Sequence, residues 1–237
     1  MVAGTNDWRQ NHAAYNRGEM DKWAMANTPY SIGYVHEADI PVQYKLAEAF
    51  TVGDMYYESI ISSTAPNRVS WFSGTINPPK GSKVNGTNKY MGGPTLDNRD
   101  SVGCERTDSG KPFSCVPLRW KTVPEYLQEA GISWRVYQDK DNFGDDPLVM
   151  WKQYQTSAKK KGDLAQRGTS FPGLQKFFDD ARDGKLPEVA YIVAPMQLSE
   201  HPPYMPMDGA WIQGEVAKAV MHGKNWDSTA LIYSYDE

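Results

Sequence analysis

Three small hydroxyl residues, Ser62, Ser63 and Thr64, stand directly before the run Ala65-Pro66-Asn67-Arg68. A hydroxyl can act as a nucleophile once a base or a metal ion activates it. An arginine guanidinium pairs well with an anionic group such as phosphate, because it can donate two parallel hydrogen bonds. The same residues also suit an ordinary helix N-cap followed by a turn. The segment therefore predicts either a nucleophile with an anion-binding partner or a helix start.

A pair of carboxylates, Asp236 and Glu237, follows an apolar run that ends at Tyr235. Carboxylate oxygens are the ligands that hard divalent cations prefer. In parallel sheets, ligands bind beyond the carboxyl ends of the strands, and residues 229–235 are predicted to form a strand. The pair is therefore a candidate metal site, and a solvated acidic end is the alternative.

Among the four histidines, His201 has the surroundings that best favour a site. It precedes Pro202-Pro203, which would stiffen its loop and hold the imidazole in place. The loop follows the strand predicted at 188–194, so the topology places His201 on the same rim as the acidic pair. An ordinary surface histidine is the alternative.

Helices and strands alternate in the second half of the sequence. The capping box of Thr122 and Glu125 predicts one helix start, and Asp208 is a suitable N-cap for another. The first forty residues show no clear period and are predicted to be irregular, with one helical turn at most. The predicted elements are helices at 40–52, 122–131, 172–184 and from 208, and strands at 132–138, 188–194 and 229–235.

This alternation predicts an α/β fold with a mostly parallel sheet that helices cover. The strand at 188–194 is almost wholly apolar, as expected for a strand that is buried on both faces. The length of 237 residues fits one domain, residues 1–237, and the loop-rich stretch 77–120 is expected on its surface.

The charge balance excludes one class of partner. The chain carries 25 basic and 29 acidic residues, a net charge of −4, and no run of five basic residues, so no nucleic-acid partner is expected. No apolar stretch approaches 18 residues, so no transmembrane segment is predicted. The first residues lack the basic and apolar regions of a secretory signal peptide.

Two cysteines, Cys104 and Cys115, lie in a polar, turn-rich segment. They cannot form a structural zinc site alone, because such a site needs four ligands. A disulfide between them would stabilise the fold by roughly 3 kcal/mol in the chain-entropy model. Their number alone leaves a disulfide and two free thiols equally open.

Three stretches of the chain, taken in order, resemble one known family. Residues 38–76, 120–143 and 200–237 look like the bacterial and fungal phosphoesterase family, which includes phosphocholine-type phospholipases C and a related acid phosphatase. The resemblance covers almost the whole chain. The run Gly4-Thr5-Asn6-Asp7-Trp8 and the cysteine loop look most like the fungal members. The resemblance implies a phosphoester hydrolase that releases phospholipid headgroups.

The family's fold is similar to that of alkaline phosphatase, which implies an α/β/α sandwich with a mostly parallel central sheet and a site at its carboxyl rim. The run Ser63-Thr64-Ala65-Pro66-Asn67-Arg68 matches the family's nucleophile motif. The resemblance therefore implies that Thr64 attacks phosphorus and that Asn67 and Arg68 bind the substrate.

Two further motifs match. Glu200-His201-Pro202 matches the family's Glu-His-Pro motif and implies that His201 is catalytic, beside the phosphate or the metal. Tyr235-Asp236-Glu237 matches its Tyr-Asp-Glu motif and implies that Asp236 and Glu237 bind a divalent metal ion of unidentified kind. The ion would lower the pKa of the hydroxyl and neutralise charge on the phosphoryl oxygens. A covalent phosphothreonine would form and then be hydrolysed.

The sequence departs from the family's pattern at both ends. Members carry a Glu-Asn-Arg motif upstream of the first residue here, and continue past Tyr-Asp-Glu into Gly-Gly-Phe-Phe-Asp-His. The resemblance therefore implies truncation at both ends, an incomplete sheet and only part of the metal ligands. Members are usually exported, which implies a secreted protein and favours a disulfide between Cys104 and Cys115.

Three other functions stay open. One is a non-catalytic relative that binds phosphate or lipid headgroups at most, and metal content would separate it from a hydrolase. Another is an acid phosphatase acting on small phosphoesters. A sulfatase is the third, because Cys115-Val116-Pro117-Leu118-Arg119 has the spacing of a formylglycine motif, although it stands apart from the other candidate residues. The sequence does not fix the oligomeric state.

Overall fold

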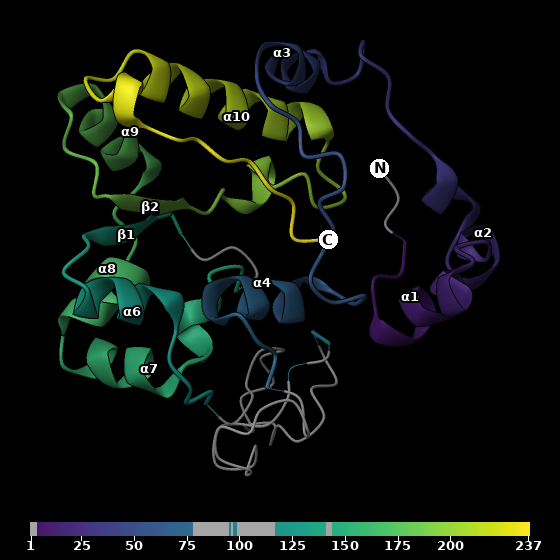
Figure 1. Ribbon diagram of the computed structural model, residues 1–237, viewed down its shortest axis with the longest axis horizontal. Coiled ribbons are helices and arrows are strands. Elements are labelled where there is room, and N and C mark those ends of the chain that lie inside the picture. Colours follow the sequence, from purple (N-terminus) through teal and green to yellow (C-terminus); the bar gives the residue numbers. More distant parts are fainter. Residues whose placement is uncertain (1–3, 78–94, 96, 99–116, 141–143) are drawn as a thin grey trace.

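The structure is a computed structural model that describes residues 4–77, 95, 97–98, 117–140 and 144–237 (Figure 1). The predicted disulfide partners Cys104 and Cys115 lie outside these residues, as does most of the loop-rich stretch 77–120. The described helices before the first strand are α1 (Trp8–Tyr15), α2 (Trp23–Ala26), α3 (Pro41–Ala49), α4 (Thr64–Ser73) and α6 (Val123–Glu129). The later helices are α7 (Lys152–Lys159), α8 (Asp163–Gly168), α9 (Leu174–Asp183) and α10 (Pro206–Met221).

Short 3-10 turns connect several of these helices. They are η1 (Asn16–Gly18), η2 (Pro29–Ile32), η3 (Pro147–Met150), η4 (Met196–Leu198) and η5 (Trp226–Ser228). Within the described part of the chain, no helix is both long enough and apolar enough to cross a membrane.

Two parallel strands form the sheet, β1 (Trp134–Tyr137) and β2 (Val189–Ile192), in the register Trp134 opposite Val189. This result confirms the strands predicted at 132–138 and 188–194, although both are shorter. The prediction that the second strand is buried on both faces is wrong, because all four residues of β2 are only half-buried. Among the described residues β2 has a single ladder partner, so its second edge is not covered by another strand.

Helices cover both faces of this sheet. Figure 1 shows α9 and α10 on one side of the strands and α4, α6, α7 and α8 on the other. Successive side chains of a strand point to opposite faces, so Trp134 and Val136 enter one apolar cluster and Tyr137 enters the other. The first cluster contains Val69, Phe72, Leu118, Trp134, Val136, Leu148, Met150, Trp151, Tyr154 and Val193. The second contains Tyr137, Leu174, Phe177, Ile212, Val216 and Val220.

Local signals account for some of the helix ends. The capping box predicted at Thr122 is present, since Glu125 Oε2 accepts a hydrogen bond from the Thr122 backbone N–H at 2.9 Å. Helix α9 ends as predicted at Gly184, which takes the left-handed conformation at φ +70°. The prediction that Asp208 is an N-cap is wrong. Helix α10 begins at Pro206, and Asp208 instead accepts a hydrogen bond from the Met205 N–H at 3.0 Å.

The N-terminal forty residues are more helical than predicted. Helix α1 begins after Asp7, whose carboxylate accepts from the Gln10 N–H at 2.9 Å, and α2 and two 3-10 turns follow. The expectation of one helical turn at most is therefore wrong. A clear apolar period is missing because α1 buries only Asn11 and Ala14.

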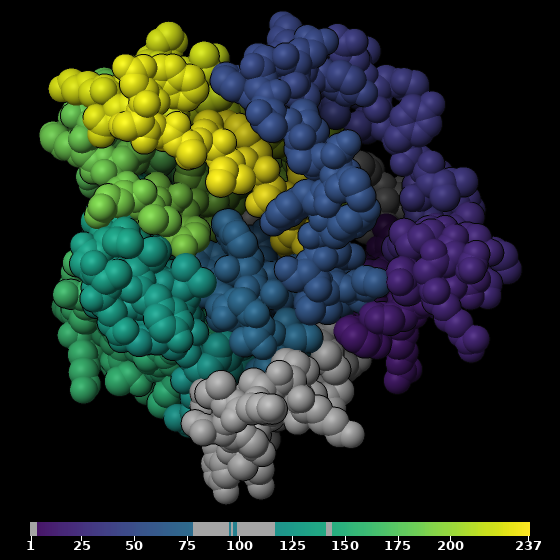
Figure 2. All heavy atoms as spheres, viewed as in Figure 1, coloured from purple at the N-terminus to yellow at the C-terminus, as the bar shows by residue number. Residues whose placement is uncertain are grey.

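The strand predicted at 229–235 is also wrong. This segment has no ladder partner among the described residues, and the side chain of Ile232 is 82% exposed. Side chains hold it instead: Leu231 packs on the second apolar cluster, and the Tyr233 hydroxyl donates to the Gln213 carbonyl at 2.6 Å. Figure 2 shows this yellow segment running to the middle of the face, where it meets the blue part of the chain.

Candidate active site

Thr64 is the first residue of α4, so the helix start predicted there is confirmed. Ser63 precedes it in an extended conformation, and the residue that caps the helix comes from elsewhere in the chain. Asn98 Oδ1 accepts from the Ala65 N–H at 2.6 Å, and the Asn98 N–H donates to Ser63 Oγ at 2.9 Å. These bonds satisfy a backbone donor that a helix N-terminus leaves without a partner. They hold Thr64 at the tip of the helix.

Asn67 is buried and secures the loop that leads into α4. Its Oδ1 accepts from the Ile60 N–H at 2.9 Å, and its Nδ2 donates to the Ile60 carbonyl at 2.9 Å. The same Nδ2 lies 3.3 Å from the Ser63 carbonyl and 3.0 Å from Glu58 Oε2. The described geometry gives Asn67 a positioning task, and its predicted role in substrate binding stays a prediction.

Arg68 lies one turn into α4 and bridges two acidic residues. Its Nε donates to Asp236 Oδ2 at 3.1 Å. Its Nη2 is 3.3 Å from Asp145 Oδ2, and its Nη1 donates to the Asp145 carbonyl at 2.9 Å. The arginine thus joins α4 to the loop after β1 and to the C-terminal segment.

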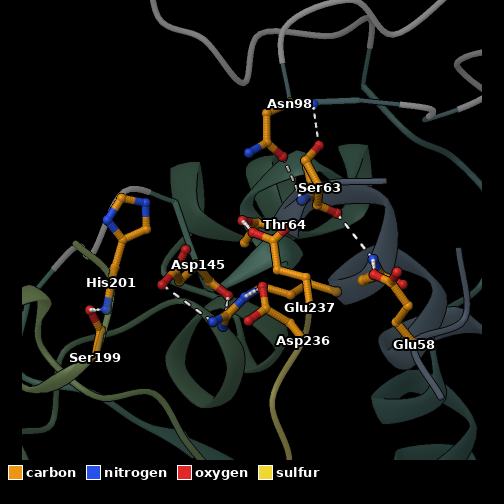
Figure 3. A network of polar contacts seen from close by, with 12 residues as sticks. Glu58, Ser63, Thr64, Asn98, Asp145, Ser199, His201, Asp236 and Glu237 are labelled. Carbon is orange, nitrogen blue, oxygen red and sulfur yellow. Dashed lines mark hydrogen bonds and ion pairs between the residues drawn. The ribbon is translucent and has the colours of Figure 1, made fainter. Parts of the chain in front are cut away.

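The side chains of Thr64 and Glu237 meet at the tip of α4 (Figure 3). Thr64 Oγ1 donates to Glu237 Oε1 at 2.6 Å, and Asn6 Nδ2 donates to the same oxygen at 2.8 Å. The predicted nucleophile and one predicted metal ligand are therefore in direct contact. Asp236, the other predicted ligand, reaches the same place through its bond to Arg68.

Three carboxylates gather here, and their charges disturb one another. Partial desolvation, with smaller contributions from the charges of Asp236 and Glu58, raises the pKa of Glu237 to about 7 against the hydrogen bonds from Thr64 and Asn6. Desolvation also raises the pKa of Glu58, with a smaller contribution from Asp236, while the bond from Asn67 lowers it. An excess of negative charge at one place favours the binding of a cation.

The oxygen atoms at the tip of α4 are of the chemical type that a divalent metal ion prefers. Asp236 and Glu237 offer carboxylate oxygens and Thr64 offers a hydroxyl, all of them hard ligands. Among the described residues, however, no group of three or more His, Cys, Asp or Glu side chains has an arrangement that could hold a metal. The donor atoms therefore fit the chemistry of a metal ion, and metal binding by Asp236 and Glu237 stays a prediction.

His201 lies in the loop between β2 and α10, at the edge of this network in Figure 3, and its side chain is exposed. Its Nδ1 is 2.7 Å from the Pro202 carbonyl oxygen, and its backbone N–H donates to Ser199 Oγ. A carbonyl only accepts, so Nδ1 carries the proton and Nε2 of the neutral ring keeps the lone pair. These two contacts of His201 lie within its own loop.

The sequence did not point to several residues of the network. Asn6, Glu58 and Asp145 bind predicted site residues, and Asp97 and Asn98 bind Ser63 and Ala65 at the start of α4. Each is a common polar residue in a loop. Asn6 stands in the run Gly4-Thr5-Asn6-Asp7-Trp8, but nothing in that run indicated a site. Only the acidic pair in the run Gly144-Asp145-Asp146 offered a compositional signal.

Comparisons with known proteins bear on this site. The chain is 40% identical to the non-hemolytic phospholipase C of Pseudomonas aeruginosa over 241 residues, which cover 100% of this chain and 32% of the relative. It is 32% identical to the non-hemolytic phospholipase C of Burkholderia pseudomallei, over 97% of this chain and 33% of that protein. It is 33% identical to phospholipase C A of Mycobacterium tuberculosis, over 98% of this chain and 44% of that protein.

The chain thus spans about a third of the length of the first two relatives. The family match is described as the phosphoesterase family and extends over residues 3–237. The residues that form the network around Thr64 all lie within this match. The chain therefore belongs to the phosphoesterase family.

Proposed function

We propose that this chain carries the nucleophile of a phospholipase C-type phosphoester hydrolase. Membership of the phosphoesterase family and the names of its relatives support a phosphoric ester hydrolase. The single observation that carries the proposal is the 2.6 Å hydrogen bond from Thr64 Oγ1 to Glu237 Oε1 at the tip of α4. A hydroxyl that donates to a carboxylate can lose its proton as it attacks.

In the proposed reaction, Thr64 Oγ1 attacks the phosphorus of a phospholipid and passes its proton to Glu237 Oε1. The bond from phosphorus to the glycerol oxygen breaks, and that oxygen leaves as an alcohol after taking up a proton. The headgroup phosphate stays on Thr64 as a phosphothreonine. Water then attacks the phosphorus, releases the phosphorylated headgroup and restores the hydroxyl.

The start of α4 favours an anion at this point. The N-terminus of a ten-residue helix has a partial positive charge, and the charge of Arg68 lies one turn along. Arg68 would bind the phosphate beside Asp236 and Asp145, whereas Asn67 would act by shaping the loop before Thr64. His201 would approach the phosphate from its loop through Nε2.

Asp236 and Glu237 would hold a divalent metal ion of unidentified kind. Such an ion supplies positive charge that stabilises the phosphoryl oxygens and lowers the pKa of the nucleophilic hydroxyl. The negative charges of Asp236 and Glu58, which add to the desolvation that raises the pKa of Glu237 to about 7, support a cation here.

The finer features of the resemblance belong to the same proposal. The helices on both faces of the small parallel sheet support an alkaline phosphatase-like sandwich. Secretion, a disulfide between Cys104 and Cys115, and a likeness to fungal members rest on the sequence resemblance alone.

Hydrolysis of p-nitrophenylphosphorylcholine by the purified chain with added Mn²⁺ tests the proposal. We expect turnover that Thr64→Ala abolishes and Thr64→Ser partly keeps, because serine retains a hydroxyl at the same position. Equal rates for the wild type and Thr64→Ala would overturn the assignment of the nucleophile.

Two parallel measurements separate the other functions. Faster hydrolysis of p-nitrophenyl phosphate than of the choline ester would indicate an acid phosphatase. A folded chain that binds inorganic phosphate without turning over either ester would indicate a non-catalytic relative. Titration with Mn²⁺, followed by the electron paramagnetic resonance of the free ion, tests whether Asp236→Asn and Glu237→Gln weaken metal binding.

A further inference from the structure

Glu200 connects three segments that lie far apart in the sequence. Its carboxylate accepts from the Tyr235 hydroxyl at 3.0 Å to Oε2 and from Gln213 Nε2 at 2.8 Å to Oε1. Gln43 Nε2 lies 3.4 Å from Oε1. These partners come from the C-terminal segment, from α10 and from α3, so one carboxylate receives a hydrogen bond from each.

The donors are also connected to one another. Gln213 Nε2 lies 3.2 Å from the Tyr235 hydroxyl oxygen, which closes a triangle of Glu200, Gln213 and Tyr235. A closed set of hydrogen bonds restrains its members more than separate pairs do.

The backbone of Glu200 adopts an unusual conformation to reach this place. Its φ is +66°, in the left-handed region that non-glycine residues seldom adopt. Its side chain crosses α10 at Gly209, where an added Cβ would lie 2.1 Å from Glu200 Cγ and 2.2 Å from Oε1. Gly209 therefore leaves the space that the Glu200 side chain occupies.

Glu200 and its partner Tyr235 are each next in the sequence to a proposed site residue. Glu200 directly precedes His201, and its partner Tyr235 directly precedes Asp236. The C-terminal segment has no ladder partner among the described residues, so side-chain bonds such as these determine where it lies.

We propose that Glu200 is a positioning residue that holds His201 and the pair Asp236 and Glu237 at one site, and that Gly209 provides the space it needs. This inference rests on the proposed function. Glu200 acts through Tyr235 and through its own loop, and it does not contact the substrate. Loss of the carboxylate would therefore reduce the rate of the chemical step more than the binding of substrate.

Kinetics of the full chain with p-nitrophenylphosphorylcholine and Mn²⁺ provide the first test. We expect Glu200→Ala to lower kcat by roughly 10- to 100-fold with little change in KM, as for other residues that orient a site. Glu200→Gln keeps an acceptor for Gln213 and a polar partner for Tyr235, and should restore most of the rate. An equal loss in both variants, or no loss in either, would overturn the proposal.

Two glycines of α10 give a matched pair of variants. Gly209→Ala should displace the Glu200 side chain and lower kcat as Glu200→Ala does. At Gly214 an added Cβ would meet only Val42 Cγ1 at an ordinary 3.5 Å, so Gly214→Ala should keep the rate and the melting temperature. If Gly209→Ala is as active as Gly214→Ala, Gly209 does not have the role proposed.

Hydrogen–deuterium exchange gives a readout that does not need turnover. Glu200→Ala should speed exchange in residues 196–204, where the amides of Leu198, Ser199 and Tyr204 donate to backbone carbonyls, and leave α7 and α8 as protected as in the wild type. Exchange that is unchanged in this loop, or faster throughout, would overturn the positioning role. If the wild type hydrolyses neither ester, the proposed function fails, and local exchange alone still decides whether Glu200 positions its loop.

Discussion

The hydroxyl of Thr64 donates a 2.6 Å hydrogen bond to Oε1 of Glu237, across 173 positions of the sequence. The bond joins the N-terminus of α4 to a segment that runs beside α10 without belonging to a strand. It brings together the two groups that a hydroxyl nucleophile needs, an oxygen to attack and a carboxylate to accept its proton.

Replacement of Glu237 by Gln should separate activity from stability. Gln keeps an oxygen that accepts from Thr64 but has no charge, so we expect the hydrolysis rate to fall by about 100-fold or more. The melting temperature should stay equal or rise, because the substitution removes a carboxylate that desolvation, Asp236 and Glu58 all disfavour. Both quantities can be measured on the same preparation.

The control for this variant is Glu215→Gln, at a partly exposed position on α10 that pairs with Lys218. It removes the same charge far from the site and should change neither quantity measurably. A marked fall in the melting temperature of Glu237→Gln would contradict the expectation that the charge of Glu237 destabilises the fold.

The bridge made by Arg68 predicts a cost in stability. Arg68→Ala leaves Asp145, which is nearly buried, and Asp236 without the guanidinium, and should lower the free energy of unfolding by about 1–3 kcal/mol. Arg68→Lys should recover only part of this loss, because an ammonium cannot reproduce the planar fork that meets both carboxylates. Urea unfolding measures the difference.

Arg182 is the comparison for Arg68, because it also meets two aspartates but on an exposed face of α9. Arg182→Ala should leave the urea midpoint nearly unchanged. If the two alanine variants unfold at the same urea concentration, the bridge of Arg68 contributes nothing specific.

The sequence predicted the motifs of the candidate site and, through the resemblance, that they belong to one site, but not the contacts between them. The hydroxyl run, the histidine loop and the acidic pair each have a recognisable pattern, and the structure brings Thr64 against Glu237 and Arg68 against Asp236. The residues that fix those motifs had no signal of their own. Asn98 caps α4 from a distant part of the chain, and a cap from elsewhere cannot be read from neighbouring residues.

Asn67 was predicted to bind the substrate, but its contacts in the structure hold the loop before α4. Asn67→Asp replaces the Nδ2 donor with an oxygen that faces Glu58 Oε2 and two carbonyls. We expect the free energy of unfolding at about pH 7 to fall by about 2 kcal/mol or more. The reason is that Glu58 Oε2 and the two carbonyl oxygens would then face a carboxylate oxygen, which cannot donate a hydrogen bond to them. Chemical denaturation checks the value, and a change below the error of the measurement would show that the loop adjusts.

The fold was predictable where one local pattern decided the element. Strands β1 and β2 and helices α3, α6 and α9 follow from apolar period, a capping box and glycine stops. The segment 229–235 has the same strand-like composition, but a strand also needs a partner, and none lies beside it among the described residues. Composition reports a tendency of the segment itself, whereas pairing depends on the rest of the fold.

The hydrogen bonds between Ser133 and Glu188, at the start of the two strands, predict that the stability of the fold depends on pH. Glu188 Oε2 accepts from the Ser133 N–H at 2.8 Å and from the Ser133 hydroxyl at 2.9 Å, directly before β2 and β1. These bonds hold the pKa of Glu188 below its ordinary value of 4.5, with the backbone N–H as the larger cause. The bond to the charged form therefore stabilises the folded state above that ordinary pKa. The contribution is lost as the pH falls through the lowered value.

Glu188→Gln should remove this contribution. We expect the variant to unfold at a lower urea concentration than the wild type at about pH 7. The two midpoints should converge as the pH falls through the lowered pKa of Glu188, because both side chains are then neutral. Ser133→Ala should show only the smaller part of this pH dependence, because it keeps the backbone N–H that donates to Glu188 and removes only the hydroxyl. It also loses the bond from the Glu188 N–H to the hydroxyl, at every pH. A constant difference between wild type and Glu188→Gln at every pH would mean that the packing of the side chain, and not its charge, stabilises the junction of the two strands.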